Sequence, residues 1–314
     1  MITVRIEAKA AVAQDVCALT LVAADGGHLP AFTAGAHVDV HLPGGLVRQY
    51  SISNDPAETH RYVLGVLLEA QSRGGSKAVH EQLTPGQTLQ VSAPKNHFPL
   101  ATQARRSLLI AGGIGITPIL AMARQLASEG ADFEFHYAAS SAERMAFRAD
   151  IEASDWADAA NFHVGPERLD VKQLLATQDG DVHVYVCGPK RLIDAVVDAA
   201  QDLGWAAERV HREFFAGAEA PASGQDRAFE IELRSGRVIS VPADRSAAQA
   251  LIAAGVPLLT SCEQGVCGTC LTRVIAGQPE HRDLYLTPEE QAANDQFLPC
   301  CSRARDARLV LDLG

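Results

Sequence analysis

No apolar run in this chain of 314 residues approaches the length of about 20 residues that a helix needs to span a bilayer. The first residues, MITVRIEAKAAVAQDV, also lack the apolar core of a secretory signal peptide. We therefore expect a cytoplasmic protein. An excess of basic residues is missing as well, because 38 acidic against 27 basic residues give a net charge of −11. This charge argues against nucleic acid and anionic membranes as partners.

The remaining composition is that of a globular protein, with 47% hydrophobic and 21% charged residues. The length suffices for two or three domains, and no internal repeat is present. Seven cysteines occur, an odd number, and most of them are clustered near the C-terminus. In the cytoplasm such cysteines bind a cofactor more often than they form disulfides.

Three blocks that differ in composition and in their pattern of predicted strands and helices follow one another along the chain. Residues 1–100 contain short β-rich runs with a turn about every ten residues, which predicts an antiparallel β-barrel or sandwich. Asp25-Gly26-Gly27 and Pro43-Gly44-Gly45 have the composition of hairpin loops. Residues 101–216 alternate strands and helices, which predicts a doubly wound α/β domain with a parallel sheet.

A segment of small residues, 217–226, reads as a linker before the last block, 227–314. That block opens with two strands joined at Ser235-Gly236, and SAAQALIAAG follows as a helix. The stretch SCEQGVCGTC, residues 261–270, comes next. We therefore expect a multidomain protein with a third, C-terminal domain built around the cysteines.

Cys262, Cys267 and Cys270 have the spacing C-x4-C-x2-C, and Cys300 lies 29 residues further on. This is the spacing of plant-type [2Fe–2S] ligands. The intervening Gly265, Gly268 and Thr269 are small, so the backbone can fold closely around a cluster and direct N–H groups at its sulfurs.

Other uses of these cysteines remain open from the residues alone. Cys267 and Cys270 have the spacing of a redox dithiol, and a zinc site is a further alternative, although zinc sites usually show two short cysteine pairs. Cys301 competes with Cys300 as the fourth ligand, and the residues alone leave this choice open. Cys17 lies in a β-rich run and is expected to pack in the core.

Two glycine turns predict a nucleotide crevice in the second block. IAGGIGITP, residues 110–118, and VYVCGP, residues 184–189, each place glycines at the end of a buried strand. The carboxyl ends of parallel strands meet at one crevice, where a phosphate can approach a helix N-terminus. Neither turn matches G-x-G-x-x-G, and two ordinary strand–helix turns are the alternative.

Two motifs of the first block favour binding of a phosphate and a ring. RQYSIS, residues 48–53, supplies the bidentate guanidinium of Arg48 and the aromatic Tyr50. RGGS, residues 73–76, offers successive backbone N–H groups that can bind an anion. Each motif taken alone is equally typical of a barrel strand or a plain turn.

Taken together, these motifs and their order resemble the phthalate dioxygenase reductase family, to which vanillate O-demethylase reductases are closely related. The motifs that carry the resemblance, over the whole chain, are YSISNDP, RGGS, AGGIGITPIL, YVCGP, SCEQGVCGTC, HRDLYL and CSRARDARLVLDL. The resemblance implies FMN in the barrel, NADH on the α/β domain and a plant-type [2Fe–2S] ferredoxin domain at the C-terminus. The implied function is electron transfer from NADH through FMN and the cluster to a separate Rieske-type oxygenase.

The resemblance also implies roles for particular residues. Thr117 and Phe215 would act at the reactive edge of the flavin, with Phe214 as the alternative to Phe215, and Cys262, Cys267, Cys270 and Cys300 would hold the cluster. His163 and His211 are expected to be structural. The implied cofactor-binding residues are Arg48, Gln49, Tyr50, Ser51, Val66, Gly74, Gly75, Ser76, Gly112, Gly113, Thr117, Cys187, Gly188, Pro189 and Phe215.

Several alternatives stay open at this point. FAD is the alternative to FMN, and NADPH is the alternative to NADH because Ser141 and Arg144 are available to a 2′-phosphate. The electron acceptor is a cytochrome P450 in a second interpretation. In a third, the chain is a non-enzymatic iron–sulfur or zinc module, which would bind no flavin and oxidise no NADH.

Overall fold

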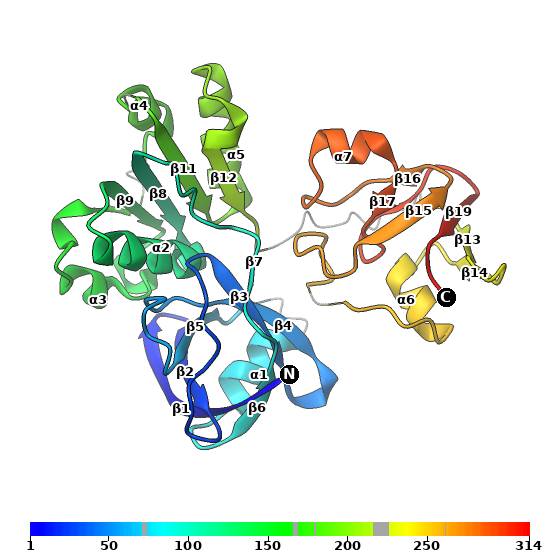
Figure 1. Ribbon diagram of the computed structural model, residues 1–314, viewed down its shortest axis with the longest axis horizontal. Coiled ribbons are helices and arrows are strands. Elements are labelled where there is room, and N and C mark those ends of the chain that lie inside the picture. The colour runs from blue at the N-terminus through cyan, green and yellow to red at the C-terminus, as the bar shows by residue number, and fades with distance from the viewer. Residues whose placement is uncertain (71–73, 166–168, 179, 216–225, 261) are drawn as a thin grey trace. The chain divides into compact units, whose positions relative to one another are not determined.

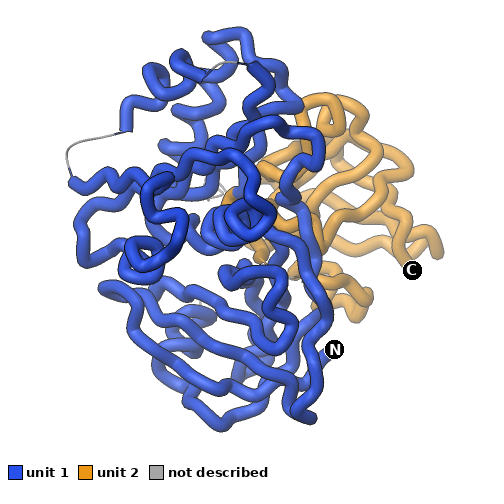
Figure 2. Tube along the Cα trace, turned by 60° about the vertical axis from the view of Figure 1, so that its left-hand side comes forward, with its two compact units in different colours: residues 1–213 blue, residues 214–314 orange. Residues whose placement is uncertain are grey.

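The computed structural model describes residues 1–70, 74–165, 169–178, 180–215, 226–260 and 262–314. It divides the chain into two compact units, residues 1–213 and 214–314 (Figure 2). Among the described residues, no helix is both long and apolar enough to cross a membrane.

The first part of the first unit is a seven-stranded antiparallel sheet (Figure 1). Its strand order is β4-β3-β6-β1-β2-β5, and β7 pairs with β3. An isolated bridge between Ile52 and Leu64 connects the two ends of this path. The elements are β1 (Ile2–Ala13), β2 (Val16–Ala23), β3 (Ala36–His41), β4 (Val47–Ser51), β5 (Tyr62–Leu67), α1 (Gly75–Gln82), β6 (Thr88–Val91) and β7 (Lys95–Asn96).

The two predicted hairpin loops have different outcomes. Pro43-Gly44-Gly45 joins β3 to β4, which are antiparallel neighbours, so this hairpin is confirmed. The prediction for Asp25-Gly26-Gly27 is wrong, because β2 pairs with β1 and β5 and not with β3. The Gly26 N–H does bond to the Ala23 carbonyl, but the chain then crosses to a distant position in the sheet. A local turn signal predicts that the chain reverses direction, but it does not predict which strand the next segment pairs with.

The second part of the first unit is a five-stranded parallel sheet of order β10-β9-β8-β11-β12. The chain starts at the centre with β8, builds outward to β10, and returns to add β11 and β12 on the other side. This reversal places a topological switch between β8 and β11, as expected of a doubly wound sheet. The strands are β8 (Arg106–Gly112), β9 (Phe133–Ala139), β10 (Ala160–Val164), β11 (Val182–Cys187) and β12 (Val210–Glu213).

Helices connect these strands, and α2 packs on the sheet through apolar side chains. Ile119 and Leu120 of α2 share one core with Leu109, Phe135 and Tyr185 of the strands. Pro118 lies in the first turn and Gly130, with φ +66°, lies just past the end, as the sequence predicts. The helices are α2 (Ile116–Ser128), α3 (Arg148–Glu152), α4 (Val171–Ala176) and α5 (Lys190–Asp202).

Several hydrogen bonds connect the antiparallel and parallel parts of the first unit. Arg124 of α2 donates from Nη1 to the Ser53 carbonyl at 2.8 Å, and Gln125 Oε1 accepts from the Ala34 N–H at 3.1 Å. The Tyr185 hydroxyl accepts from the Ala101 N–H at 2.7 Å. The antiparallel and parallel parts therefore form one unit, with strand β5 close to the start of α2.

The second unit has a five-stranded mixed sheet of order β14-β13-β19-β15-β17 and a small pair, β16-β18. Its longest helix, α6, starts with a capping box in which Ser246 and Gln249 bond to each other's backbone. The elements are β13 (Phe229–Leu233), β14 (Val238–Val241), α6 (Ala247–Ala253), β15 (Thr272–Ala276), β16 (Pro279–Glu280), α7 (Pro288–Ala293), β17 (Gln296–Phe297), β18 (Arg303–Ala304) and β19 (Arg308–Leu311).

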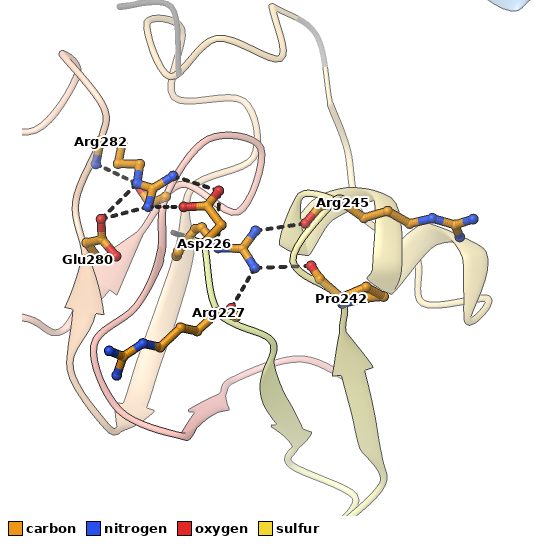
Figure 3. Close-up of polar contacts among 8 residues, drawn as sticks. Asp226, Arg227, Pro242, Arg245, Glu280 and Arg282 are labelled. Atoms are coloured by element: carbon orange, nitrogen blue, oxygen red, sulfur yellow. Dashed lines mark hydrogen bonds and ion pairs between the residues drawn. The ribbon is translucent and has the colours of Figure 1, made fainter. Parts of the chain in front are cut away.

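A buried polar network holds the start of this unit (Figure 3). Arg282 binds both carboxylate oxygens of Asp226, at 2.7 and 3.2 Å, and also binds Glu280. The buried Arg303 donates to the carbonyls of Arg227, Pro242 and Arg245. Asp226, which the sequence placed last in the linker, is thus bonded to the second unit. The other linker residues, 217–225, lie outside the described residues.

Candidate functional sites

The two motifs of the first block meet at the start of α1. Arg48 of β4 lies directly against Gly75, since a Cβ at Gly75 would be 2.6 Å from Arg48 Cγ and 2.7 Å from its Nε. Gly74 precedes the helix with φ +90°, a conformation that favours glycine. Arg73 of the motif lies outside the described residues. A guanidinium beside an eight-residue helix N-terminus is a fitting environment for a phosphate.

The neighbouring side chains suit a ring and a polar tail. Ser51 is buried, and Gln49 and Tyr50 are half-buried on the same strand. Burial raises the pKa of the Tyr50 phenol well above its ordinary value, so the hydroxyl stays protonated. The Ser76 hydroxyl accepts from the Glu69 N–H at 3.1 Å.

Thr117 lies where the two sheets of the first unit meet. A Cβ at Gly65 of β5 would be 2.7 Å from the Thr117 methyl group and 3.0 Å from the Phe147 ring, so only glycine allows this approach. Thr117 is buried and donates its hydroxyl hydrogen to the Ile114 carbonyl at 3.2 Å. Val66 follows Gly65 and is also buried. Thr117 and Gly65 are therefore close in space, although they come from different blocks of the sequence.

The glycine turns after β8 and β11 cross at backbone contact distance. A Cβ at Gly115 would be 2.3 Å from the Cys187 carbonyl oxygen, and one at Gly188 would be 2.9 Å from Gly112 Cα. A Cβ at Gly112 would also lie 2.7 Å from the Pro189 ring. Gly113 has φ +53°, which lets the turn lead into α2. The structure thus brings Gly112, Gly188 and Pro189 together at the switch point of the sheet.

Buried Cys187 and half-buried Glu213 form a pair at this crevice. They are direct neighbours in the parallel pairing of β11 and β12, and Glu213 is the last residue of its strand. Burial raises the pKa of Glu213 to about 8, and its Oε2 makes no hydrogen bond to a described residue. Burial, with the nearby carboxyl, raises the pKa of the Cys187 thiol well above its ordinary value. Both groups are therefore neutral at pH 7.

Sequence analysis missed Glu213, whose only signal is a single acidic residue at the carboxyl end of a strand beside REFF. Phe215 follows two residues later and is 36% exposed. Phe214 and Phe215 belong to the second compact unit, so their position relative to Thr117 is not defined. The flavin-facing role of Phe215 stays a prediction.

His163 and His211, expected to be structural, each hydrogen-bond to another histidine. His136 Nδ1 and His163 Nε2 lie 2.9 Å apart, and His183 Nδ1 and His211 Nε2 are separated by the same distance. Burial and the neighbouring imidazole lower the pKa of His211 to about 4. A hydrogen bond between two imidazoles requires that one nitrogen accept, which favours neutral rings.

The four predicted cluster ligands converge in the second unit. Cys262, Cys267, Cys270 and Cys300 are all buried, and none of them forms a disulfide with a described residue. Hydrogen bonds from the thiols of Cys267 and Cys300, and from the Gln264 and Val266 N–H groups, lower the pKa of Cys262 well below its ordinary value. The Thr269 N–H points at Cys267 Sγ at 3.5 Å. Converging thiols with backbone donors fit a [2Fe–2S] cluster.

Cys301 has a different environment from Cys300. It is partly exposed, and its sulfur lies 3.7 Å from both the Leu298 carbonyl and the Ser302 hydroxyl. A Cβ at Gly265 would be 2.4 Å from Cys301 Sγ, so Cys301 packs on the back of the cysteine loop. Cys17, in the first unit, is buried, as expected.

Comparisons with known proteins identify two related domains and relatives that cover the whole chain. Residues 231–305 match the model of the 2Fe-2S iron-sulfur cluster binding domain, and residues 92–210 match the N-terminal domain of dimethylamine monooxygenase subunit DmmA-like proteins. A vanillate O-demethylase oxidoreductase from Pseudomonas sp. (strain HR199 / DSM 7063) is 54% identical over 318 residues, which cover 100% of both chains.

Two solved structures superpose on nearly the whole of this chain. Phthalate dioxygenase reductase, described as a modular structure for electron transfer from pyridine nucleotides to [2Fe–2S], superposes with a TM-score of 0.80 at 36% identity, covering 99% of this chain and 97% of that one. A type IV self-sufficient cytochrome P450 monooxygenase superposes with a TM-score of 0.84 at 38% identity, over 99% of this chain and 41% of that one.

Fold, cysteine set and crevice together define an electron-transfer oxidoreductase that combines flavin, pyridine nucleotide and [2Fe–2S] chemistry. Within this class, the chain belongs to the phthalate dioxygenase reductase family, which includes the vanillate O-demethylase oxidoreductases. The predicted resemblance is confirmed, as are the multidomain organisation and the ferredoxin domain. Closure of the first sheet into a barrel stays a prediction.

Proposed function

We propose that this chain is the reductase of a Rieske-type oxygenase and passes electrons from NADH through FMN and a [2Fe–2S] cluster to that oxygenase. The observation that supports this most directly is the coexistence of two kinds of site in one chain. A phosphate-binding environment and a nucleotide crevice lie in the first unit, and four converging cysteines lie in the second. When bound, the flavin and the cluster allow the two electrons of NADH to be passed on one at a time.

We further propose an assignment of the parts. Residues 1–100 form an FMN-binding antiparallel barrel, 101–216 bind NADH, 217–226 link the parts and 227–314 form the ferredoxin domain. Arg48, Gly74, Gly75 and Ser76 bind the FMN phosphate, and Gln49, Tyr50, Ser51, Val66 and Thr117 surround the ring and its tail. The proximity of Arg48 to Gly75, and of Thr117 to Gly65, supports this assignment.

Gly112, Gly113, Cys187, Gly188 and Pro189 receive the nicotinamide nucleotide in this proposal, and Phe215 shields the flavin until nicotinamide enters. Neutral Cys187 and Glu213 exclude water and fixed charge from the crevice. NADH is favoured over NADPH because Arg144, the candidate for a 2′-phosphate, bonds Asp15 at 3.1 Å. A cation paired with a carboxylate is a poorer phosphate ligand.

Cys262, Cys267, Cys270 and Cys300 hold the cluster in the proposed function. The identity of 54% to a vanillate O-demethylase oxidoreductase favours an acceptor that demethylates a methoxylated aromatic acid. A cytochrome P450 is the second candidate, since a self-sufficient P450 monooxygenase contains a segment of the same fold.

Reconstitution tests the choice of acceptor. The purified reductase is combined with a vanillate O-demethylase oxygenase component, NADH and vanillate, and formaldehyde is measured against NADH consumed. We expect coupled turnover with the oxygenase and slow, uncoupled NADH oxidation with a P450. Coupled turnover only with the P450 would contradict the proposal. The Cys267→Ser variant serves as the matched control, because it removes the proposed exit route for single electrons.

A further inference from the structure

The motif HRDLYL, residues 281–286, lies against the cysteine loop of the second unit. The Leu284 N–H donates to the Gly265 carbonyl at 3.0 Å. A Cβ at Gly268 would be 2.3 Å from the Tyr285 ring, so the aromatic side chain packs directly on the loop backbone. Neither contact uses a cysteine, and the proposed function assigns this motif no role.

Asp283 lies at the centre of the motif and its side chain is 0% exposed. One carboxylate oxygen, Oδ2, accepts from the Leu286 N–H at 2.9 Å, and the other, Oδ1, accepts from the Ser302 hydroxyl at 3.3 Å. Ser302 is also fully buried, and its oxygen accepts from the Arg282 N–H at 3.1 Å. Asp283 thus connects the motif to the turn that carries Cys300.

The same residue is in contact with the other ligand-bearing segment. A Cβ at Gly265, in the loop of Cys262, Cys267 and Cys270, would be 3.0 Å from both Cα and Cβ of Asp283. Asp283 therefore lies between the loop that carries three ligands and the turn that carries the fourth. A shift of this side chain would change how the two segments meet.

The charge of Asp283 has one close compensating group. A buried carboxylate is costly unless hydrogen bonds or an opposite charge compensate it. His281 Nδ1 lies 3.5 Å from Asp283 Oδ1 with its side chain 7% exposed, and neither ring nitrogen hydrogen-bonds to a described residue. The neighbouring Arg282 guanidinium binds Asp226 and Glu280 instead. His281 is the only histidine in residues 214–314.

We propose that Asp283 is a positioning residue of the cluster site that, balanced by His281, sets the reduction potential of the cluster. The reduced cluster carries one more negative charge than the oxidised one, and a fixed carboxylate nearby in a low-dielectric interior disfavours that charge. The His281 ring, 3.5 Å from the carboxylate, is the group that offsets it. This inference rests on the cysteine ligand set of the proposed function.

A redox titration of the whole protein, followed by the electron paramagnetic resonance signal of the reduced cluster, tests the proposal. Asp283→Asn keeps the size of the side chain and removes its charge, so we expect the cluster potential to become more positive. His281→Gln removes the compensating group, so we expect a shift in the opposite direction. The flavin potential, read in the same titration, is expected to stay at the wild-type value.

Glu289→Gln is the matched control, because it removes one negative charge from an exposed position on α7 of the same unit. Its cluster potential should equal that of the wild type. Unchanged potentials in Asp283→Asn and His281→Gln, or an equal shift in Glu289→Gln, would overturn the proposal. If Asp283→Asn does not retain the cluster, the cluster potential of His281→Gln alone tests the proposal. A wild-type protein without the cluster signal would instead contradict the proposed function.

Discussion

Cys300 and Cys301 are adjacent and chemically identical, yet their environments separate them. The thiol of Cys300 lies among those of Cys262 and Cys270, whereas Cys301 packs on Gly265 and is partly exposed. We therefore predict that Cys300→Ser loses most of the visible absorption of the cluster, while Cys301→Ser retains it. Iron and sulfide analysis of both variants checks this. Cluster loss in Cys301→Ser with retention in Cys300→Ser would reverse the ligand assignment.

Cys267 tests whether flavin and cluster work as separate steps. Cys267→Ser is expected to abolish the cluster but leave NADH-dependent ferricyanide reduction within about twofold of the wild type, since that activity requires only the first unit. Reduction of cytochrome c, a one-electron acceptor, should fall by at least tenfold, an order-of-magnitude expectation for losing the exit site. Loss of both activities would contradict the modular account.

The raised pKa of Glu213 predicts how the free energy of unfolding depends on pH. Its pKa is about 8 in the fold against 4.5 ordinarily, so the folded state keeps a proton that the unfolded chain loses first. The stabilising contribution is complete below pH 4.5 and is lost as pH rises to about 8. Glu213→Gln cannot lose this proton, so its free energy of unfolding should fall less between pH 5 and pH 8 than that of the wild type.

Urea unfolding of the first unit at these two pH values measures the effect. Glu208→Gln, at an exposed position just before β12, is the control and should follow the wild type. A parallel pH dependence of Glu213→Gln and the wild type would show that Glu213 ionises normally in the fold.

At this scale, sequence reasoning singled out residues whose type and spacing predict the chemistry. C-x4-C-x2-C and the glycines of the two turns are examples, because few other residues satisfy those geometries. Glu213 and Asp283 were missed for one reason. A carboxylate at either position looks like any surface acid until the fold shows that Asp283 is buried and that one carboxylate oxygen of Glu213 is buried.

At the scale of elements, the network around Arg303 explains how the short β16-β18 pair is held. Two residues from each strand pair there, too few for a stable ladder. Arg303 adds three hydrogen bonds to backbone carbonyls and packs over the Phe229 ring at 5.2 Å. The buried guanidinium therefore replaces the missing ladder contacts.

Arg303→Met should destabilise the second unit by about 2–4 kcal/mol, because it removes three hydrogen bonds that a buried, charged donor makes to backbone carbonyls. Arg305→Met, at an exposed position of the same turn, is the matched control and should change stability by less than about 0.5 kcal/mol. Thermal unfolding followed by cluster absorbance measures both. Equal midpoints for the two variants would show that the network contributes little.

The order of elements was largely predictable, and their neighbours in space were less so. Strand–helix alternation from residue 105 onward correctly indicated a parallel sheet, since each helix length fits one crossover. The first block illustrates the limit. Its runs were recognisable as strands, but the turn at Asp25-Gly26-Gly27 does not join adjacent strands, because long-range pairing decides sheet order.

At the scale of the whole molecule, the chain separates the donor side from the acceptor side. Residues 1–213 contain both the phosphate-binding environment and the nucleotide crevice, and residues 214–314 contain all four cluster cysteines. This division matches the direction of electron flow in the proposed function. Which oxygenase accepts the electrons was not predictable from sequence, because acceptor choice depends on the partner's surface.

The central claim is that one chain carries electrons from NADH through flavin to the cluster. The most direct test is an absorption spectrum of the purified protein before and after anaerobic addition of NADH, with the released flavin identified by mass. The account predicts flavin and cluster bands that both bleach, and FMN in the released fraction. A colourless protein that contains zinc, or a cluster that NADH does not reduce, would contradict it.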